Sequence, residues 1–301
     1  MITPEFLKKG DTVAIVSTAR KISEAELQSA LRLLDAHGLK VILGKTIGAT
    51  AHQFAGDDAL RASDFQQQMD NPKVKAIWCA RGGYGTVRMI DLLDFSKFKK
   101  TPKWIIGYSD ITVFHNHVHH MDIETLHAQM PLEIEKKTLA TQESIFKVLF
   151  GKNYDIEFSS EIFSLNRNGT AKGQLIGGNL SMLYSLCGSN SAIKTEGKLL
   201  FLEDLDEYLY HIDRMLQNLK RNGMLENLAG LIVGGMSDMK DNTIPFGKTA
   251  EGIIAEAVSG YHFPVCFHFP AGHIEDNRAL IMGREVEFQV SDSTVQLQFK
   301  S

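Results

Sequence analysis

The first half of the chain alternates short apolar runs with segments of helical periodicity, and this alternation restricts the fold more than any other feature. The apolar runs that we expect to form strands are 12–17, 40–43, 74–79 and 104–106. The segments between and after them that we expect to form helices are 23–38, 57–71, 87–93 and the region from 111 onward. Strands that alternate with helices form a parallel sheet covered on both faces. The sequence therefore predicts an α/β fold, in which functional sites lie at the carboxyl ends of strands.

The pattern changes after residue 150. Segment 151–172 is polar and rich in turn-forming residues, and it predicts a linker between an N-terminal α/β domain (1–150) and a C-terminal domain (173–301). The C-terminal domain has two expected strands around a helical segment, and then two segments of period-two alternation that predict a β-hairpin: 199–202, 229–233, 284–290 and 294–299. We therefore expect a smaller, mixed α/β domain.

The charge balance and the cysteines restrict the class of protein. Among 301 residues, 32 Lys and Arg face 36 Asp and Glu, and this net charge of −4 argues against a nucleic acid or an anionic membrane as partner. The first residues lack the pattern of a signal peptide and no run is long enough to span a membrane, so we expect a cytoplasmic protein. Cys79, Cys187 and Cys266 show no Cys-x-x-Cys spacing and fit reduced, buried thiols; a catalytic cysteine is the alternative.

The segment Gly107-Tyr108-Ser109-Asp110 joins an expected strand to an expected helix. A serine at a sharp strand-to-helix turn projects its hydroxyl away from the sheet, beside free helix N–H groups that can hold an oxyanion. Ser109 is therefore a candidate nucleophile. Position 111 is Ile, so the full Gly-x-Ser-x-Gly elbow is absent, and the alternative role of Ser109 is a helix N-cap.

Glycines follow another expected strand, 74–79, in the segment Ala80-Arg81-Gly82-Gly83-Tyr84-Gly85. Two adjacent glycines at a strand end let the backbone approach a ligand and direct N–H groups toward it. The spacing does not match the G-x-G-x-x-G loop of dinucleotide-binding proteins. A tight turn without a ligand is the alternative.

Two further strand ends carry residues suited to proton transfer. Glu203 and Asp204 follow the apolar run 199–202, and a partly desolvated carboxylate there could orient an imidazole. His273 lies on a Pro- and Gly-containing loop after an apolar run, where a histidine could act as a base near neutral pH. A helix-capping carboxylate and a surface histidine are the alternatives. Together with Ser109, they give the chain order Ser, acid, His, which is found in hydrolases of α/β architecture.

A cluster of histidines, 115–120, follows the candidate nucleophile. His115 and His119 are four residues apart on the expected helix and could share a metal ion. No Glu completes an H-E-x-x-H pattern, so we interpret the cluster as a solvated helix face and expect neither a metal nor a cofactor.

Five motifs in order along nearly the whole chain resemble the LD-carboxypeptidase family of serine peptidases, which includes cytosolic murein tetrapeptide carboxypeptidases and microcin-immunity peptidases. The motifs are Cys-Ala-Arg-Gly-Gly-Tyr-Gly at 79–85, Gly-Tyr-Ser-Asp-Ile-Thr at 107–112, Gly-Gly-Asn-Leu at 177–180, Leu-Glu-Asp at 202–204 followed by Ile-Asp-Arg at 212–214, and Phe-Pro-Ala-Gly-His at 269–273. One departure is Ser17-Thr18-Ala19, where the family usually has Pro-Ser or Pro-Ala after its first strand.

The resemblance implies a flavodoxin-like N-terminal domain, a smaller C-terminal domain and a homodimer. It implies Ser109 as nucleophile, His273 as general base and Glu203 as the residue that orients His273. It places the oxyanion hole at the backbone N–H groups of Gly83 and Asp110. The same motifs suggest substrate-binding roles for three further residues, Arg81, Gly82 and Asn179.

The reaction implied is hydrolysis of a peptide bond through an acyl-enzyme, which releases the terminal D-Ala of a muropeptide tetrapeptide during cell-wall recycling. A triad drawn from both domains requires strand ends of both to converge. The alternative within the family is a peptidase for peptidyl nucleotides or acyl-amide toxins, for which we expect an aromatic residue stacked on the base; the two tryptophans, Trp78 and Trp104, lie instead in expected strands. A zinc carboxypeptidase and a non-enzymatic binding protein are further alternatives.

Overall fold

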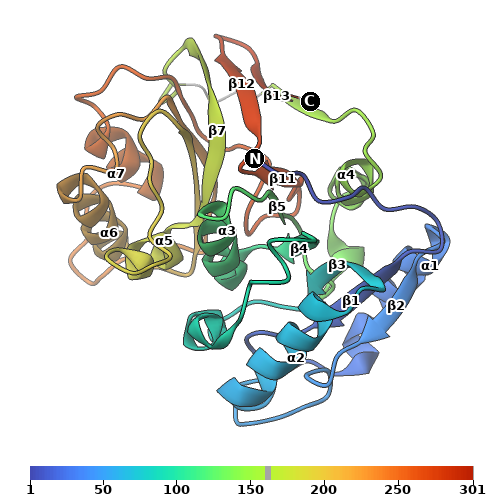
Figure 1. Cartoon of the computed structure of the whole chain (residues 1–301). Helices are drawn as coiled ribbons and strands as arrows, with labels where there is room; N and C mark the ends of the chain where they lie inside the picture. The colour runs from blue at the N-terminus through green and yellow to red at the C-terminus, as the bar shows by residue number, and fades with distance from the viewer. Residues whose placement is uncertain (160–163, 301) are drawn as a thin grey trace. The chain divides into compact units, whose positions relative to one another are not determined.

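The computed structural model describes residues 1–159 and 164–300, and the chain forms two compact units. Unit 1 contains Met1–Asn153 together with the short segment Glu275–Ile281. Unit 2 contains Tyr154–Ile274 and Met282–Ser301. Each unit has its own sheet, and each is described separately below (Figure 1).

The sheet of unit 1 has the strand order β11-β5-β4-β3-β1-β2. Its strands are β1 (Thr12–Val16), β2 (Lys40–Leu43), β3 (Val74–Cys79), β4 (Trp104–Gly107), β5 (Thr125–His127) and β11 (Leu280–Met282). The pairs among the first five strands are parallel. The order 2-1-3-4-5 is that of flavodoxin-like folds, so the predicted α/β class and the flavodoxin-like sheet are confirmed.

Four α-helices belong to unit 1: α1 (Gln28–Ala36), α2 (Asp58–Asp70), α3 (Thr112–His119) and α4 (Leu139–Leu149). One expected helix differs. Segment 87–93 forms two 3-10 turns, Thr86–Arg88 and Ile90–Leu92, because its N–H groups bond three residues back, as from Met89 to the Thr86 carbonyl. The first of these turns packs against the turn Ser109–Ile111 that follows β4.

Unit 2 contains a mixed sheet with the order β10-β9-β8-β7-β12-β13-β6. Its strands are β6 (Asp155–Phe158), β7 (Gly169–Asn179), β8 (Leu199–Leu205), β9 (Gly230–Ser237), β10 (Val265–Cys266), β12 (Glu285–Val290) and β13 (Val295–Phe299). Strands β7 to β10 are parallel neighbours, whereas β12 and β13 form the predicted antiparallel hairpin. The expected linker differs from the structure, since 151–172 contains β6 and the start of β7; residues 160–163 of that segment lie outside the described residues.

Helices α5 (Leu180–Leu186), α6 (Leu209–Arg221) and α7 (Ala250–Ala257) lie together beside the parallel strands of unit 2 (Figure 1). The apolar stripe of α6 packs into the core of this unit through Ile212, Met215, Leu216 and Leu219, all fully buried. Burial of such side chains stabilises a fold by roughly 1.5–3 kcal/mol each, relative to an exposed position. The helices thus cover one side of the strands whose carboxyl ends carry the candidate residues. In the part of the chain that is described, no helix is both long and apolar enough to cross a membrane.

Candidate active site

Ser109 lies at the turn between β4 and α3, where the sequence predicts it. Its backbone has φ 63, in the left-handed region that non-glycine residues seldom adopt. Gly107 has φ +158, and a Cβ there would approach Ile111 Cγ1 to 2.7 Å, so the turn needs glycine at this position. The N-cap of the 3-10 turn Ser109–Ile111 is Tyr108, so the alternative role of Ser109 as N-cap is not realised. A strained serine at a strand-to-helix turn is typical of a nucleophile elbow.

The glycines after β3 lie against this elbow. A Cβ on Gly82 would be 3.1 Å from Ser109 Cβ and 3.2 Å from Ser109 Oγ. Gly83 has φ +112, and a Cβ on it would clash with the side chain of Arg20 at 2.6 Å. Gly82 therefore lies directly against the serine, and Gly83 follows it in a left-handed conformation that favours glycine, so this turn can place backbone donors beside a nucleophile.

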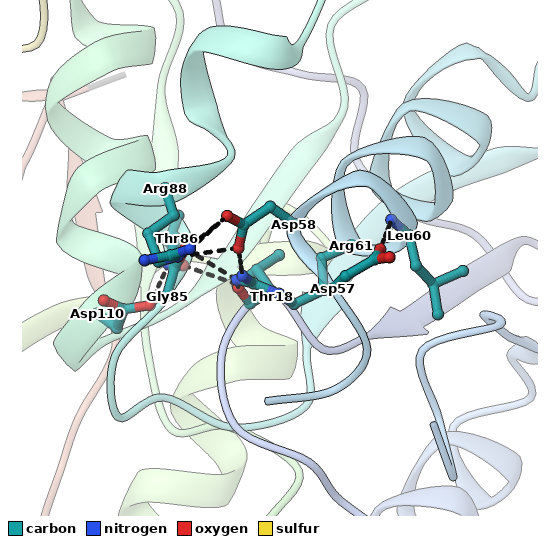
Figure 2. Close-up of polar contacts among 9 residues, drawn as sticks. All are labelled: Thr18, Asp57, Asp58, Leu60, Arg61, Gly85, Thr86, Arg88 and Asp110. Atoms are coloured by element: carbon teal, nitrogen blue, oxygen red, sulfur yellow. Dashed lines mark hydrogen bonds and ion pairs between the residues drawn. The ribbon is translucent and has the colours of Figure 1, made fainter. Parts of the chain in front are cut away.

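Asp110, next to the serine, joins the elbow to the glycine turn. Its carboxylate is buried, and Oδ2 accepts a hydrogen bond of 2.8 Å from the backbone N–H of Thr86 (Figure 2). The pKa of this carboxyl is raised, because the effect of burial exceeds the opposing effects of the bonds from Thr86 and Gly85 and of the charge of Arg61. Two strand ends, those of β3 and β4, are thereby tied together by one side chain.

Glu203 and His273 form a hydrogen-bonded pair in unit 2. Glu203 Oε2 lies 2.6 Å from His273 Nδ1 and also accepts a bond of 3.1 Å from the backbone N–H of His273. The side chain of Glu203 is 0% exposed and that of His273 is 14% exposed. A buried carboxylate on Nδ1 fixes the orientation of the ring, and it favours the tautomer that has its proton on Nδ1 and leaves Nε2 able to accept a proton.

Local backbone geometry sets the position of this pair. Strand β8 extends beyond the expected end at 202, and its register with β9 shifts between Leu202 and Asp204, so Glu203 lies at a bulge. Gly272, with φ +104, passes so close to Glu203 that a Cβ would lie 2.7 Å from the Cβ of Glu203. Ser237 Oγ donates to the His273 carbonyl at 2.7 Å. The histidine loop is therefore held on both sides.

Asp204 and Asn179 are held together next to Glu203. Asn179 caps α5 with its side-chain oxygen, and its Nδ2 donates to Asp204 Oδ1 at 2.9 Å. Asp204 Oδ2 accepts a hydrogen bond of 2.9 Å from the backbone N–H of Ser181, so Asp204 satisfies a free N–H group at the start of α5. Burial and the neighbouring Glu203 raise the pKa of Asp204 to about 7. The predicted substrate-binding residue Asn179 thus has a structural role at a helix end.

The other candidates have different surroundings. Arg81 is partly exposed, and its Nη1 donates to the Lys21 carbonyl at 3.0 Å beside a surface hollow of about 310 Å³.

The three cysteines are free thiols; burial raises the pKa of each, which disfavours the reactive thiolate. Cys187 is only half-buried, unlike Cys79 and Cys266, since it ends a short helix near the surface.

The predicted solvated face of the histidine cluster is wrong. His115 and His119 are buried, because α3 packs against both β4 and β5. His115 Nδ1 lies 2.8 Å from Thr125 Oγ1, and its Nε2 lies 2.9 Å from the Gly107 carbonyl. Burial lowers the pKa of His115 to about 3, so the ring is neutral. Within the described residues, no group of three or more His, Cys, Asp or Glu could hold a metal ion.

Arg61 and its neighbours are not among the residues predicted from the sequence. Arg61 is fully buried on α2 and bonds to the turn that contains Gly85 (Figure 2). A signal was present: Arg61, Phe65 and Met69 are four residues apart, so the arginine falls on the apolar stripe of its helix, where a charge needs a partner.

Comparisons with known proteins agree with this geometry. Residues 13–128 match the LD-carboxypeptidase N-terminal domain, and residues 172–288 match the LD-carboxypeptidase C-terminal domain. The chain is 34% identical to the "Probable murein peptide carboxypeptidase" of Bacillus subtilis (strain 168), covering 98% of this chain and 94% of that protein. It is 25% identical to the Microcin C7 self-immunity protein MccF of Escherichia coli, covering 97% and 94%. The crystal structure of muramoyltetrapeptide carboxypeptidase from Oxalobacter formigenes superposes with a TM-score of 0.87 at 26% identity, covering 96% of this chain and 99% of that one.

These matches extend over both units and include the segments that carry Ser109, Glu203 and His273. The family and the class of enzyme predicted from the sequence, a serine-type carboxypeptidase, are confirmed. The chain belongs to the LD-carboxypeptidase family.

Proposed function

We propose that the protein is a serine LD-carboxypeptidase whose catalytic triad is Ser109, Glu203 and His273. The observation that carries the proposal is the left-handed backbone of Ser109 at the β4–α3 turn, with Gly82 packed against its side chain. A helix-capping or surface serine has no need of this strain. The second support is the pairing of Glu203 with His273 Nδ1.

Ser109 attacks the carbonyl carbon of the scissile bond while His273 Nε2 takes the hydroxyl proton. His273 then gives this proton to the leaving amine, and the acyl-enzyme remains. Water deprotonated by the same ring hydrolyses the acyl-enzyme and restores the serine. Glu203 orients the ring and stabilises its cationic form during both steps. The chemistry requires His273 to come within hydrogen-bond reach of Ser109, about 2.6–3.2 Å when substrate is bound.

The backbone N–H groups of Gly83 and Asp110 are the proposed oxyanion hole. Gly83 lies in the turn that packs on the serine, and Asp110 follows the serine at the start of the 3-10 turn. N–H groups at the start of a helical turn are not used by the turn itself, so they can donate to a developing charge. Loss of one such donor typically lowers kcat by about 10²- to 10³-fold.

The proposed substrate is a muropeptide tetrapeptide, from which the enzyme releases the terminal D-Ala that follows the L-centre of a diamino acid. Support comes from relatives named for murein peptides and muramoyltetrapeptide. Arg81 and Gly82, near the elbow, and Asn179, beside Asp204, are proposed to bind substrate. The proposal includes a cytoplasmic location and a homodimer; light scattering of the purified protein tests the second.

A peptidyl nucleotide is the second candidate substrate, because the MccF protein is also a relative. We favour the muropeptide because both tryptophans are buried in strands. Trp78 Nε1 donates to the Gln129 carbonyl, and Trp104 Nε1 donates to the Glu5 carbonyl. Neither indole is available to stack on a nucleobase.

The test is to incubate the protein separately with muropeptide tetrapeptide, with pentapeptide, and with an aminoacyl sulfamoyl adenosine, and to identify products by mass spectrometry. We expect loss of one alanine from the tetrapeptide alone. Ser109→Ala is the control for a contaminating peptidase. Cleavage of the nucleotide with no cleavage of the tetrapeptide would replace the first candidate by the second.

A further inference from the structure

A charged side chain lies inside unit 1 and is not among the residues assigned to chemistry. Arg61 of α2 is 0% exposed, one of the largest fully buried side chains of the protein. Its Nη1 donates to the Thr18 carbonyl at 2.5 Å and to the Gly85 carbonyl at 2.8 Å, and its Nη2 pairs with Asp58 (Figure 2). The guanidinium also lies 4.9 Å from the centroid of the Phe54 ring.

The two carbonyls belong to the loops that follow β1 and β3. These strands are neighbours at the point where the strand order of the sheet reverses, and ligands of such sheets bind outside the carboxyl ends there. Thr18 Oγ1 and Thr86 Oγ1 lie 2.8 Å apart and join the same two loops a second time. Arg61 therefore connects the two loops that lie at the switch point of the sheet.

The contact continues to the candidate nucleophile in two steps. Gly85, whose carbonyl accepts from Arg61, precedes Thr86, and the Thr86 N–H donates to Asp110 at 2.8 Å (Figure 2). Asp110 is adjacent to Ser109. A Cβ on Gly85 would lie 2.6 Å from Arg61 Nη1, so the close approach of the guanidinium to the turn requires glycine at this position.

We propose that Arg61 is a positioning residue for the peptidase reaction: it fixes the 82–86 turn against the elbow and, through Thr86, holds Asp110 and hence the backbone of Ser109. This inference rests on the proposed role of Ser109. A planar guanidinium with donors in fixed directions suits this task, because one rigid group bonds two carbonyls and a carboxylate at once. Desolvation of a guanidinium is costly, and Nε of Arg61 is buried without a hydrogen-bond partner in the structure, so stability alone does not account for a charge at this position.

The experiment compares Arg61→Met and Arg61→Lys with Arg88→Gln as the matched control. Arg88 pairs with the same Asp58, but its side chain is 47% exposed and its guanidinium bonds the Asp58 carboxylate. The backbone N–H of Arg88 donates to the Gly85 carbonyl at 3.1 Å, and Arg88→Gln keeps this bond. For each variant, kcat and KM are measured on the muropeptide, the labelling rate of Ser109 by a fluorophosphonate is recorded, and hydrogen exchange of the Thr86 amide is followed.

For Arg61→Met we expect kcat and the labelling rate to fall about 10- to 100-fold, with KM changed less than threefold, because displacement of a catalytic group by about 1 Å has effects of this size. Thr86 exchange should become faster. Arg61→Lys keeps the charge but has one nitrogen in place of the two that bond the carbonyls and Asp58, so its kcat should fall between those of Arg61→Met and wild type. Arg88→Gln should leave kcat, labelling and exchange unchanged. If Arg61→Met does not fold, Arg61→Lys carries the comparison with Arg88→Gln.

A purely structural role predicts another result. Both Arg61 variants would then melt at lower temperature, but their folded fraction would keep the wild-type kcat and labelling rate, and this outcome overturns the proposal. Full turnover by Ser109→Ala would refute the proposed function instead, and Thr86 exchange together with kcat in the Arg61 variants would still decide whether Arg61 acts on the turn.

Discussion

The two units position their proposed catalytic residues by different means. In unit 1, Ser109 is placed by its backbone: a left-handed residue, a glycine packed on its side chain, and a buried network behind the turn. In unit 2, Glu203 and His273 are placed by direct hydrogen bonds: one carboxylate oxygen of Glu203 bonds both Nδ1 and the backbone N–H of His273. Among the residues that support the proposed catalytic groups, side-chain changes should therefore be more damaging in unit 2, and backbone changes in unit 1.

The difference follows from what each group has to do. A nucleophile must point at one carbon atom beside fixed N–H donors, and this requires a rigid backbone. A general base must keep one tautomer and accept a charge, and this requires a carboxylate partner out of water. Ser109→Ala removes the nucleophile itself, Glu203→Gln removes the carboxylate partner, and Gly82→Ala disturbs the rigid backbone.

Ser109→Ala should have the largest effect, a loss of about 10⁴- to 10⁶-fold in kcat, because it removes the nucleophile and leaves the turn intact. Turnover of the tetrapeptide and labelling by a fluorophosphonate are measured together, with circular dichroism as the check on folding. A folded Ser109→Ala protein of near wild-type activity is incompatible with the serine mechanism.

Glu203→Gln should lower kcat by about 10²- to 10⁴-fold, since the amide no longer holds the ring in one tautomer nor stabilises its cation. Asp204→Asn is the matched control, because Asp204 is the next residue on β8 but bonds the start of α5 instead of the histidine. Equal losses of kcat in the two variants would contradict the separate role of Glu203.

Gly82→Ala tests the backbone device and should lower kcat by about 10- to 100-fold, because the new methyl would lie 3.2 Å from Ser109 Oγ and must displace the turn or the serine. Gly260→Ala in unit 2 is the control, since a Cβ there meets nothing within 4 Å. A wild-type kcat for Gly82→Ala would show that the turn can shift without loss of activity, and it would contradict the claim that unit 1 depends on a rigid backbone.

The sequence predicted the two halves of the site unequally. The parallel sheet, the turn at Ser109 and the hairpin follow from local periodicity and glycine placement, which short segments encode. The pairing of Glu203 with His273 spans 70 residues: the strand ends and the order Ser, acid, His make the two residues candidates, and the family resemblance implies that they pair. Arg61 is not among the predicted residues, and His115 is predicted on a solvated face. Their environment depends on how α2 and α3 pack on the sheet, and periodicity alone does not say which polar residue of a helix finds a buried partner.

The raised pKa of Asp204 in unit 2 should make the stability of the protein depend on pH. Its pKa is raised from 3.8 to about 7 in the folded protein, so the fold binds the proton more tightly than the unfolded chain does. The stabilising contribution is complete below about pH 4 and is lost as pH rises toward 7, by about 2–4 kcal/mol in total. Asp204→Asn cannot titrate. Thermal melts at pH 5 and pH 8 should show wild type losing stability relative to Asp204→Asn at the higher pH; a constant difference would contradict the raised pKa.

The smallest expected effect is that of a chelator, which should leave kcat unchanged and so separate the serine mechanism from a zinc mechanism centred on α3. For His115 to bind a metal, the ring would have to give up either Thr125 or the Gly107 carbonyl, and the second of these bonds supports the strand end just before the elbow. Activity is measured after dialysis against EDTA and after addition of zinc, with Ser109→Ala alongside. A loss on dialysis that zinc restores would transfer the chemistry from the elbow to the histidines, and it would also require His115 to leave its buried position. His115→Gln, in which an amide can replace one of the two ring contacts, should accordingly destabilise unit 1 while remaining as insensitive to EDTA as the wild type.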